Sequence, residues 1–269
     1  MKVVFISRAT LYSNPGGDTI QITSTAQHLN QLGITADIRL TNENIDYNQY
    51  DLLHFFNIIR PADILQHIER SGKPYVVSTI FVDYYEFEKK NSGPLRKLLA
   101  TFFSPDGIEY LKVLARAAFN KEKLVSPFYI WHGQKSSIKK IISGASMLLP
   151  NSNNEYIRLL NRYTIQQKFK IVPNGINTNL FKKTGEASRD NNLVLCVARI
   201  EPLKNQLLLI RALNNSAYKL LIIGKASVNQ KKYYEKCREE AAGNVSFIDH
   251  VSQQPIWRSE ERRVGKECR

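Results

Sequence analysis

The sequence has few cysteines and no long apolar run, and both shortages restrict what the protein can be. Its three cysteines lie far apart, form no Cys-x-x-Cys pair and are odd in number. We therefore expect neither a disulfide framework nor a zinc site. No apolar stretch approaches the roughly 20 residues of a membrane-spanning helix, and the amino terminus shows no signal-peptide pattern. These features predict a cytosolic protein.

Three further signatures are missing. The sequence contains no Gly-x-Gly-x-x-Gly fingerprint, so a nicotinamide or flavin site is not supported. It has no zinc-finger or RNA-recognition motif and its basic residues are spread out, which disfavours a nucleic-acid partner. No cluster of His, Cys and Asp suggests a metal site. We expect no metal and no cofactor.

Apolar content and positive charge are what the sequence does have. The chain has 269 residues, of which 43% are hydrophobic, and a formal net charge of +14. That content supports a core for one large domain or two of ordinary size. The charge indicates an anionic partner, and charge alone does not choose among phosphate, nucleic acid and a membrane surface.

The pattern of apolar residues alternates between strands and helices in two series. Strands separated by helices predict parallel sheets with crossover connections. A polar stretch at 182–192 separates the series, so we expect two Rossmann-like domains, at 1–185 and 186–257. Residues 258–269 carry dense mixed charge and do not continue the pattern, and we interpret them as a non-native tail. The predicted strands are 2–7, 34–40, 51–56, 75–78, 193–198, 219–223 and 245–248.

Two loops that follow predicted strands are candidates for phosphate binding, because ligands of open α/β sheets bind beyond the carboxyl ends of the strands. After the first strand, Gly16 and Gly17 would let backbone amides approach an anion, although an ordinary tight turn would also use them. After the first strand of the second series, Arg199 and Lys204 would grip a diphosphate. The alternative for this pair is two solvated surface cations.

Four motifs, in this order and spacing, resemble the retaining family 4 glycosyltransferases of GT-B fold. The resemblance covers residues 1–257 and is strongest from Met147 onward. It implies an acceptor-binding first domain and a second domain that holds a nucleotide-diphosphate sugar. The motifs are Pro173-Asn174-Gly175-Ile176-Asn177 with Phe181, Ala198-Arg199-Ile200 with Lys204-Asn205, Leu221-Ile222-Ile223-Gly224, and Asn244-Val245-Ser246-Phe247.

The resemblance also implies roles for individual residues. Gly16, Gly17, Arg199 and Lys204 match the positions that bind the donor diphosphate in that family. The remaining matched positions are Asn174 and Gly175 in the hinge region, and Gly224, Asp249 and His250 near the nucleotide.

Three departures from the family pattern qualify these expectations. Asp249-His250 stands where the family usually has glycine next to the base. The family's catalytic-region histidine is absent, and Asp83 or Tyr84 would occupy its neighbourhood, with His54 and His132 as alternatives that more often serve packing or surface roles. The family's pair of glutamates separated by seven residues does not occur after Trp257. We therefore expect an incomplete second domain.

The predicted activity is transfer of a sugar, with retention, from a nucleotide-diphosphate donor to a saccharide or lipid-linked acceptor, in cell-surface polysaccharide synthesis. The alternative is a non-catalytic fragment that binds a sugar nucleotide or another polyanion. The basic helical segment 89–123 would rest on an anionic membrane at its inner face, or else pack on the core with a solvated basic face. We also expect the incomplete second sheet to leave apolar surface exposed, with poor solubility or partial disorder after about residue 190.

Overall fold

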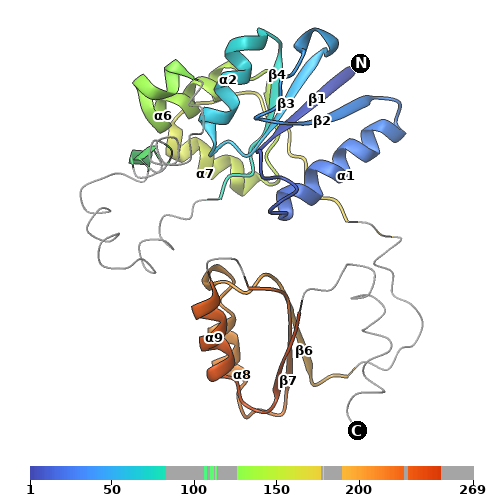
Figure 1. Ribbon diagram of the computed structural model, residues 1–269, viewed down its shortest axis with the longest axis vertical. Coiled ribbons are helices and arrows are strands. Elements are labelled where there is room, and N and C mark those ends of the chain that lie inside the picture. The colour runs from blue at the N-terminus through green and yellow to red at the C-terminus, as the bar shows by residue number, and fades with distance from the viewer. Residues whose placement is uncertain are drawn as a thin grey trace. The chain divides into compact units, whose positions relative to one another are not determined.

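A computed structural model describes residues 1–82, 106–107, 110–111, 113, 126–176, 178, 190–226 and 230–249. The chain divides into two compact units, Met1–Gly175 and Ile176–Arg269. Each unit is built on its own sheet, with five strands in the first and three in the second (Figure 1). Within the described residues, every strand pair is parallel. The predicted class, α/β with two parallel sheets, is confirmed.

The first sheet has the strand order β2-β1-β3-β4-β5. Because the order reverses direction at β1, the loops after β1 and β3 leave the sheet side by side and create a crevice at this point. The strands are β1 (Lys2–Ser7), β2 (Thr35–Leu40), β3 (Leu52–Phe56), β4 (Tyr75–Ser78) and β5 (Met147–Leu148), and the helices are α1 (Gly17–Gln31), α2 (Pro61–Ser71), α6 (Pro127–Gly144) and α7 (Asn153–Tyr163), with a short 3-10 turn at Tyr47–Gln49.

Two apolar clusters cover the two faces of this sheet. Alternate residues of a strand point to opposite faces, and β1 accordingly places Val3 and Phe5 in a cluster with α1. Val4 and Ile6 belong to a second cluster, which holds the apolar residues of α2, α6 and α7. The sheet is therefore buried on both sides, as expected for parallel strands with near-continuous apolar sequence.

The second sheet has the order β6-β7-β8. Its elements are β6 (Leu193–Val197), a 3-10 turn at Pro202–Lys204, α8 (Gln206–Leu213), β7 (Lys219–Ile223), α9 (Lys231–Glu239) and β8 (Val245–Ile248). Helices α8 and α9 lie on the same side of the sheet (Figure 1), where Ile210 and Cys237 are fully buried against Leu220 and Ile222. Cys237 is thus core filler.

The other side of β6 is open to solvent. Leu195 is 36% and Val197 50% exposed, whereas Val194 and Cys196, which alternate with them, pack against the helices. The predicted exposed apolar surface on the second sheet is present in this unit. In the parts of the chain that the structure describes, no helix has both the length and the apolar character needed to cross a bilayer.

Candidate functional site

The loop after β1 is organised around Arg8. Its Nε donates to Asp18 Oδ2 at 2.7 Å and its Nη2 donates to Asp18 Oδ1 at 3.0 Å and to the Asn14 carbonyl at 2.8 Å. Its Nη1 donates to the carbonyl and the hydroxyl of Thr10 at 2.8 and 2.9 Å. A guanidinium has five N–H donors, and all five are used here. Arg8 therefore holds the loop in shape and has no donor left for a ligand.

The two glycines of this loop differ in what surrounds them. The Gly16 amide donates to Thr19 Oγ1 at 3.0 Å, and the Thr19 hydroxyl donates to the Leu11 carbonyl. A Cβ on Gly16 would lie 3.0 Å from Asp18 Oδ1, so glycine makes room for the Arg8–Asp18 pair. A Cβ on Gly17 would meet nothing within 4 Å. A side chain at 16 would therefore press on the Asp18 carboxylate, whereas the space beside Gly17 is open.

Gly17 and Asp18 are the first two residues of α1, and within the described residues their amides have no acceptor. Such amides at a helix start attract anions. Burial opposes ionisation of Asp18, but hydrogen bonds from Arg8 and from the Thr19 amide outweigh it and lower the pKa of its carboxyl. Asp18 is therefore ionised at neutral pH, and Arg8 compensates its charge at this end of the helix.

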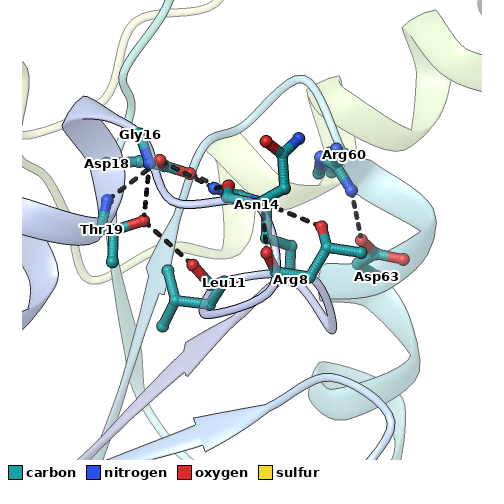
Figure 2. A network of polar contacts seen from close by, with 9 residues as sticks. Arg8, Leu11, Asn14, Gly16, Asp18, Thr19, Arg60 and Asp63 are labelled. Carbon is teal, nitrogen blue, oxygen red and sulfur yellow. Dashed lines mark hydrogen bonds and ion pairs between the residues drawn. The ribbon is translucent and has the colours of Figure 1, made fainter. Parts of the chain in front are cut away.

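The loop after β3 adds a cation that the sequence analysis did not single out. Arg60 directly precedes α2, and its guanidinium is 40% exposed and 3.7 Å from the Asp63 carboxylate (Figure 2). Its charge also contributes to the lowered pKa of Asp18. Arg60 therefore lies at the crevice where the strand order reverses. An arginine in the short loop after a predicted strand was the available signal.

Glu155 joins two further loops at the same edge of the first sheet. Its carboxylate is buried in the first turn of α7, where Oε1 accepts hydrogen bonds from the Thr79 hydroxyl and from the Phe81 amide, the latter at 2.8 Å. Its Oε2 accepts from the Asn151 amide at 2.8 Å. The loops that follow β4 and β5 are thereby fixed to each other. The predicted Asp83 and Tyr84 lie outside the described residues.

The two alternative histidines have different surroundings. His54 is buried between the rings of Phe5 and Phe56, and its Nε2 lies 2.9 Å from Ser78 Oγ. Burial lowers the pKa of His54 to about 3, so its ring is neutral at physiological pH. His132 is exposed on α6 and stacks on Phe128 with ring centres 4.0 Å apart. His54 is thus a packing residue of the sheet, and His132 a surface residue.

In the second unit, Gly224 allows two loops to lie in direct contact. It follows β7 with φ of 154°, and a Cβ there would be 1.9 Å from the Ala198 carbonyl oxygen. The loops after β6 and β7 are joined by the Ile200 amide, which donates to the Lys225 carbonyl at 3.0 Å. Only glycine fits this position.

Arg199 and Lys204 follow β6 at the carboxyl edge of the second sheet. The Arg199 guanidinium is 53% exposed and 3.7 Å from a Glu201 carboxylate oxygen. Gln206 is fully buried, and its Nε2 donates to the Arg199 carbonyl at 2.8 Å, which fixes the backbone there. Lys204 is exposed, and its ammonium has no partner within the described part of the chain. Both side chains can thus reach a ligand at this edge.

The remaining predicted residues lie at the boundary of the units or at the end of β8. Asn174 and Gly175 are exposed at the end of the first unit, next to the division at Gly175. Asp249 is exposed directly after β8, and His250 lies outside the described residues. Their roles stay predictions. Among the residues with described positions, no three His, Cys, Asp or Glu side chains group to hold a metal ion.

Comparison of this chain with known proteins identifies its fold. Neither protein-family models nor curated proteins match the sequence. The HepE protein of Anabaena, crystallised with UDP and glucose, is similar over 94% of this chain and 70% of its own, with a TM-score of 0.54 and 17% identity. Sucrose-phosphate synthase of Thermosynechococcus elongatus is similar over 96% and 72%, with a TM-score of 0.67 and 14% identity. The chain has the GT-B fold.

The GT-B likeness is not confined to these two structures. The lipopolysaccharide outer core galactosyltransferase WaaB is similar over 98% of this chain and 71% of its own, with a TM-score of 0.56 and 14% identity. The matches therefore include both units. At such identities the likeness establishes the fold, and membership of the retaining family 4 stays a prediction, as does the incomplete second domain.

Proposed function

We propose that the protein is a glycosyltransferase that takes a sugar from a nucleotide-diphosphate donor. The observation that carries the proposal is the pair of cations, Arg199 and Lys204, at the carboxyl edge of the second sheet of a GT-B fold. Arginine and lysine bind diphosphate oxygens with charge-assisted hydrogen bonds. They would neutralise the negative charge that develops on the leaving diphosphate, which is the main electrostatic demand of the reaction.

The proposed reaction proceeds with retention of configuration. The acceptor hydroxyl attacks the anomeric carbon from the face that the diphosphate leaves, so the new bond has the configuration of the old one. The open space beside Gly17 and the amides that begin α1 would receive donor phosphate oxygens. We propose Asp83 as the catalytic-region residue, Asn174 and Gly175 as the hinge, and Gly224, Asp249 and His250 as neighbours of the nucleotide.

The proposed acceptor is a saccharide or a lipid-linked sugar in cell-surface polysaccharide synthesis, met at the inner face of the membrane. The structure of HepE contains UDP and glucose, which makes UDP-glucose the first donor to test. The predicted first domain, residues 1–185 with the hinge region, would receive the acceptor, and the predicted second domain, residues 186–257, would hold part of the donor.

Calorimetry with UDP and GDP, together with a transfer assay using UDP-glucose, tests the proposal. We expect UDP or GDP to bind, and Arg199→Ala or Lys204→Ala to weaken binding by about tenfold or more, since a charge-assisted hydrogen bond contributes about 1.5–3 kcal/mol. Lys219→Ala, an exposed cation at the opposite end of β7, is the control and should leave binding unchanged. Equal binding by all four proteins would refute the proposed site.

A second candidate function is binding of a sugar nucleotide without turnover. The open side of β6, with Val197 half exposed, favours it because such a face is normally covered in a complete α/β domain. Nucleotide binding without detectable hydrolysis or transfer would support this candidate. Transfer by the chain as given would exclude it.

A further inference from the structure

The first turn of α6 exposes a tryptophan. Trp131 is 84% exposed and the preceding Ile130 is 41% exposed. Gly133, with φ of 69°, interrupts the helix directly after this turn. Tyr129 of the turn is buried in the core, whereas Ile130 and Trp131 face solvent. Large aromatic side chains are buried for most of their area in ordinary monomeric domains. The exposure of Trp131 therefore requires an explanation.

A second chain segment adds to this surface. The Tyr110 hydroxyl donates to the Ile130 carbonyl at 2.6 Å, and the Tyr110 ring lies 5.5 Å from the Tyr129 ring. Leu111, which follows Tyr110, is 42% exposed. Three exposed large apolar residues thus flank one hydrogen bond between two segments. Apolar side chains gathered in this way indicate an interaction surface more strongly than a single exposed residue does.

The charge around this turn is positive. Helix α6 contains three lysines and no acidic residue. Lys135 is exposed, and Lys140 places its ammonium 3.8 Å from the centre of the Phe128 ring, beside the first turn. Glu69 of α2 is the acidic neighbour, 3.5 Å from the Lys140 ammonium. The adjoining sequence 89–123 holds eight Lys or Arg against three Asp or Glu, and the whole chain carries +14.

We propose that Leu111, Ile130 and Trp131 form the surface through which the protein rests on an anionic lipid bilayer. Tryptophan is favoured at the level of lipid headgroups, where its ring is apolar and its N–H remains hydrated. Lysines beside such a turn interact with anionic headgroups. The inference rests on the proposed function, because a lipid-linked acceptor would be met at this surface. It names the part of the first unit that makes the contact.

The test uses the full chain with Trp257→Phe, so that Trp131 is the one remaining tryptophan of the two. Vesicles of phosphatidylcholine are compared with and without phosphatidylglycerol. We expect Trp131 emission to shift to shorter wavelength, and to be quenched by brominated lipid, only with the anionic vesicles. The shift should decline as salt is added, because salt screens the attraction.

Variants in the same background locate the contact. Trp131→Glu should lower the partition coefficient measured by vesicle co-sedimentation at least about tenfold, and Lys135→Glu should lower it by a smaller factor. Ile157→Glu changes a residue on α7 that is 42% exposed, so it matches Ile130 in exposure and should bind like the parent. Circular dichroism of each variant verifies that it is folded.

Two results would overturn the proposal. One is anionic vesicles that do not bind, or that bind without altering Trp131 emission. The other is the same spectral shift on adding a neutral oligosaccharide without lipid, which would make Trp131 a sugar-stacking residue. UDP binding is measured on the same protein by calorimetry. Lipid binding without UDP binding would count against the proposed function and leave the membrane surface supported. UDP binding without lipid binding would count against the membrane surface and leave the proposed function supported.

Discussion

Arg8 and Asp18 form a two-point ion pair, with N–O distances of 2.7 and 3.0 Å, between the end of β1 and the start of α1. Both side chains are largely shielded from solvent. The pair closes the loop that contains Gly16 and Gly17. The shape of the candidate phosphate-binding turn therefore depends on a salt bridge between two residues ten positions apart in the sequence. The loop is thus held by charge as well as by backbone hydrogen bonds.

Replacement of Asp18 by Asn should therefore destabilise the protein in a pH-dependent way. At pH 7 we expect a loss of about 1–3 kcal/mol in the free energy of unfolding, because the Arg8 donors lose a charged acceptor. The pKa of Asp18 is lowered in the folded protein from 3.8. Its contribution is present above that value and is lost as pH falls through the lower folded pKa. Urea denaturation across this range measures the difference between parent and variant, and a constant difference would contradict the argument.

The two glycines of this loop should respond differently to alanine. Gly16→Ala places a methyl group 3.0 Å from Asp18 Oδ1, so we expect it to lower stability by about 1–3 kcal/mol. Gly17→Ala meets open space and should leave stability unchanged or raise it by up to about 1 kcal/mol. Thermal melts compare the two. If donor phosphate approaches Gly17, its alanine variant should nevertheless bind UDP more weakly, and unchanged UDP affinity would argue against that approach.

Regular elements were predictable to a greater extent than the contacts between loops. Strands β1 and β7 begin and end within a residue of the prediction, because runs of apolar residues buried on both faces leave a strong sequence signal. Arg199 and Lys204 were predicted to lie between a strand end and the start of a helix, and they do, in the segment that connects β6 to α8. The hydrogen bond between Glu155 and Phe81 joins residues 74 positions apart. A single sequence carries no periodic signal for such a pair.

The space around each glycine also could not be predicted. Nothing in the sequence distinguishes Gly16 from Gly17. The position of the Asp18 carboxylate makes the surroundings of Gly16 tight, whereas Gly17 lies beside open space. Arg60 was missed for a related reason. Its nearness to the glycine loop follows from the strand order β2-β1-β3, and the order in which strands pair is a property of the assembled sheet.

Glu155→Gln should disturb the edge of the first sheet more than its small change in shape suggests. The carboxylate accepts hydrogen bonds on both oxygens, from Phe81 and Thr79 on one and from Asn151 on the other. An amide group would turn an N–H donor toward one of these donors, and we expect a loss of about 2–3 kcal/mol in unfolding free energy. Glu235→Gln, exposed on α9, is the control and should be neutral. Equal unfolding midpoints for both variants would contradict the proposed role of Glu155 in joining the loops after β4 and β5.

Gly224→Ala tests the contact between the loops after β6 and β7. Its Cβ would overlap the Ala198 carbonyl at 1.9 Å, in a backbone conformation with φ of 154°. We expect the second unit to lose at least about 2 kcal/mol of stability and UDP affinity to fall with it. Gly243→Ala, where a methyl group meets nothing within 4 Å, is the matched control. Hydrogen exchange of the β6 and β7 amides would locate the loss.

The open face of β6 predicts how the isolated chain behaves in solution. Leu195 and Val197 present apolar area to water on a sheet whose other face packs against α8 and α9, and such faces associate between molecules. Val197→Thr keeps a β-branched side chain, and therefore strand propensity, while adding a hydroxyl to the exposed face. We expect less light scattering at a given concentration and an unchanged melting temperature. Ile222→Thr, at a buried position of β7, should instead destabilise the second unit. Scattering that Val197→Thr leaves unaltered would place the association on another surface.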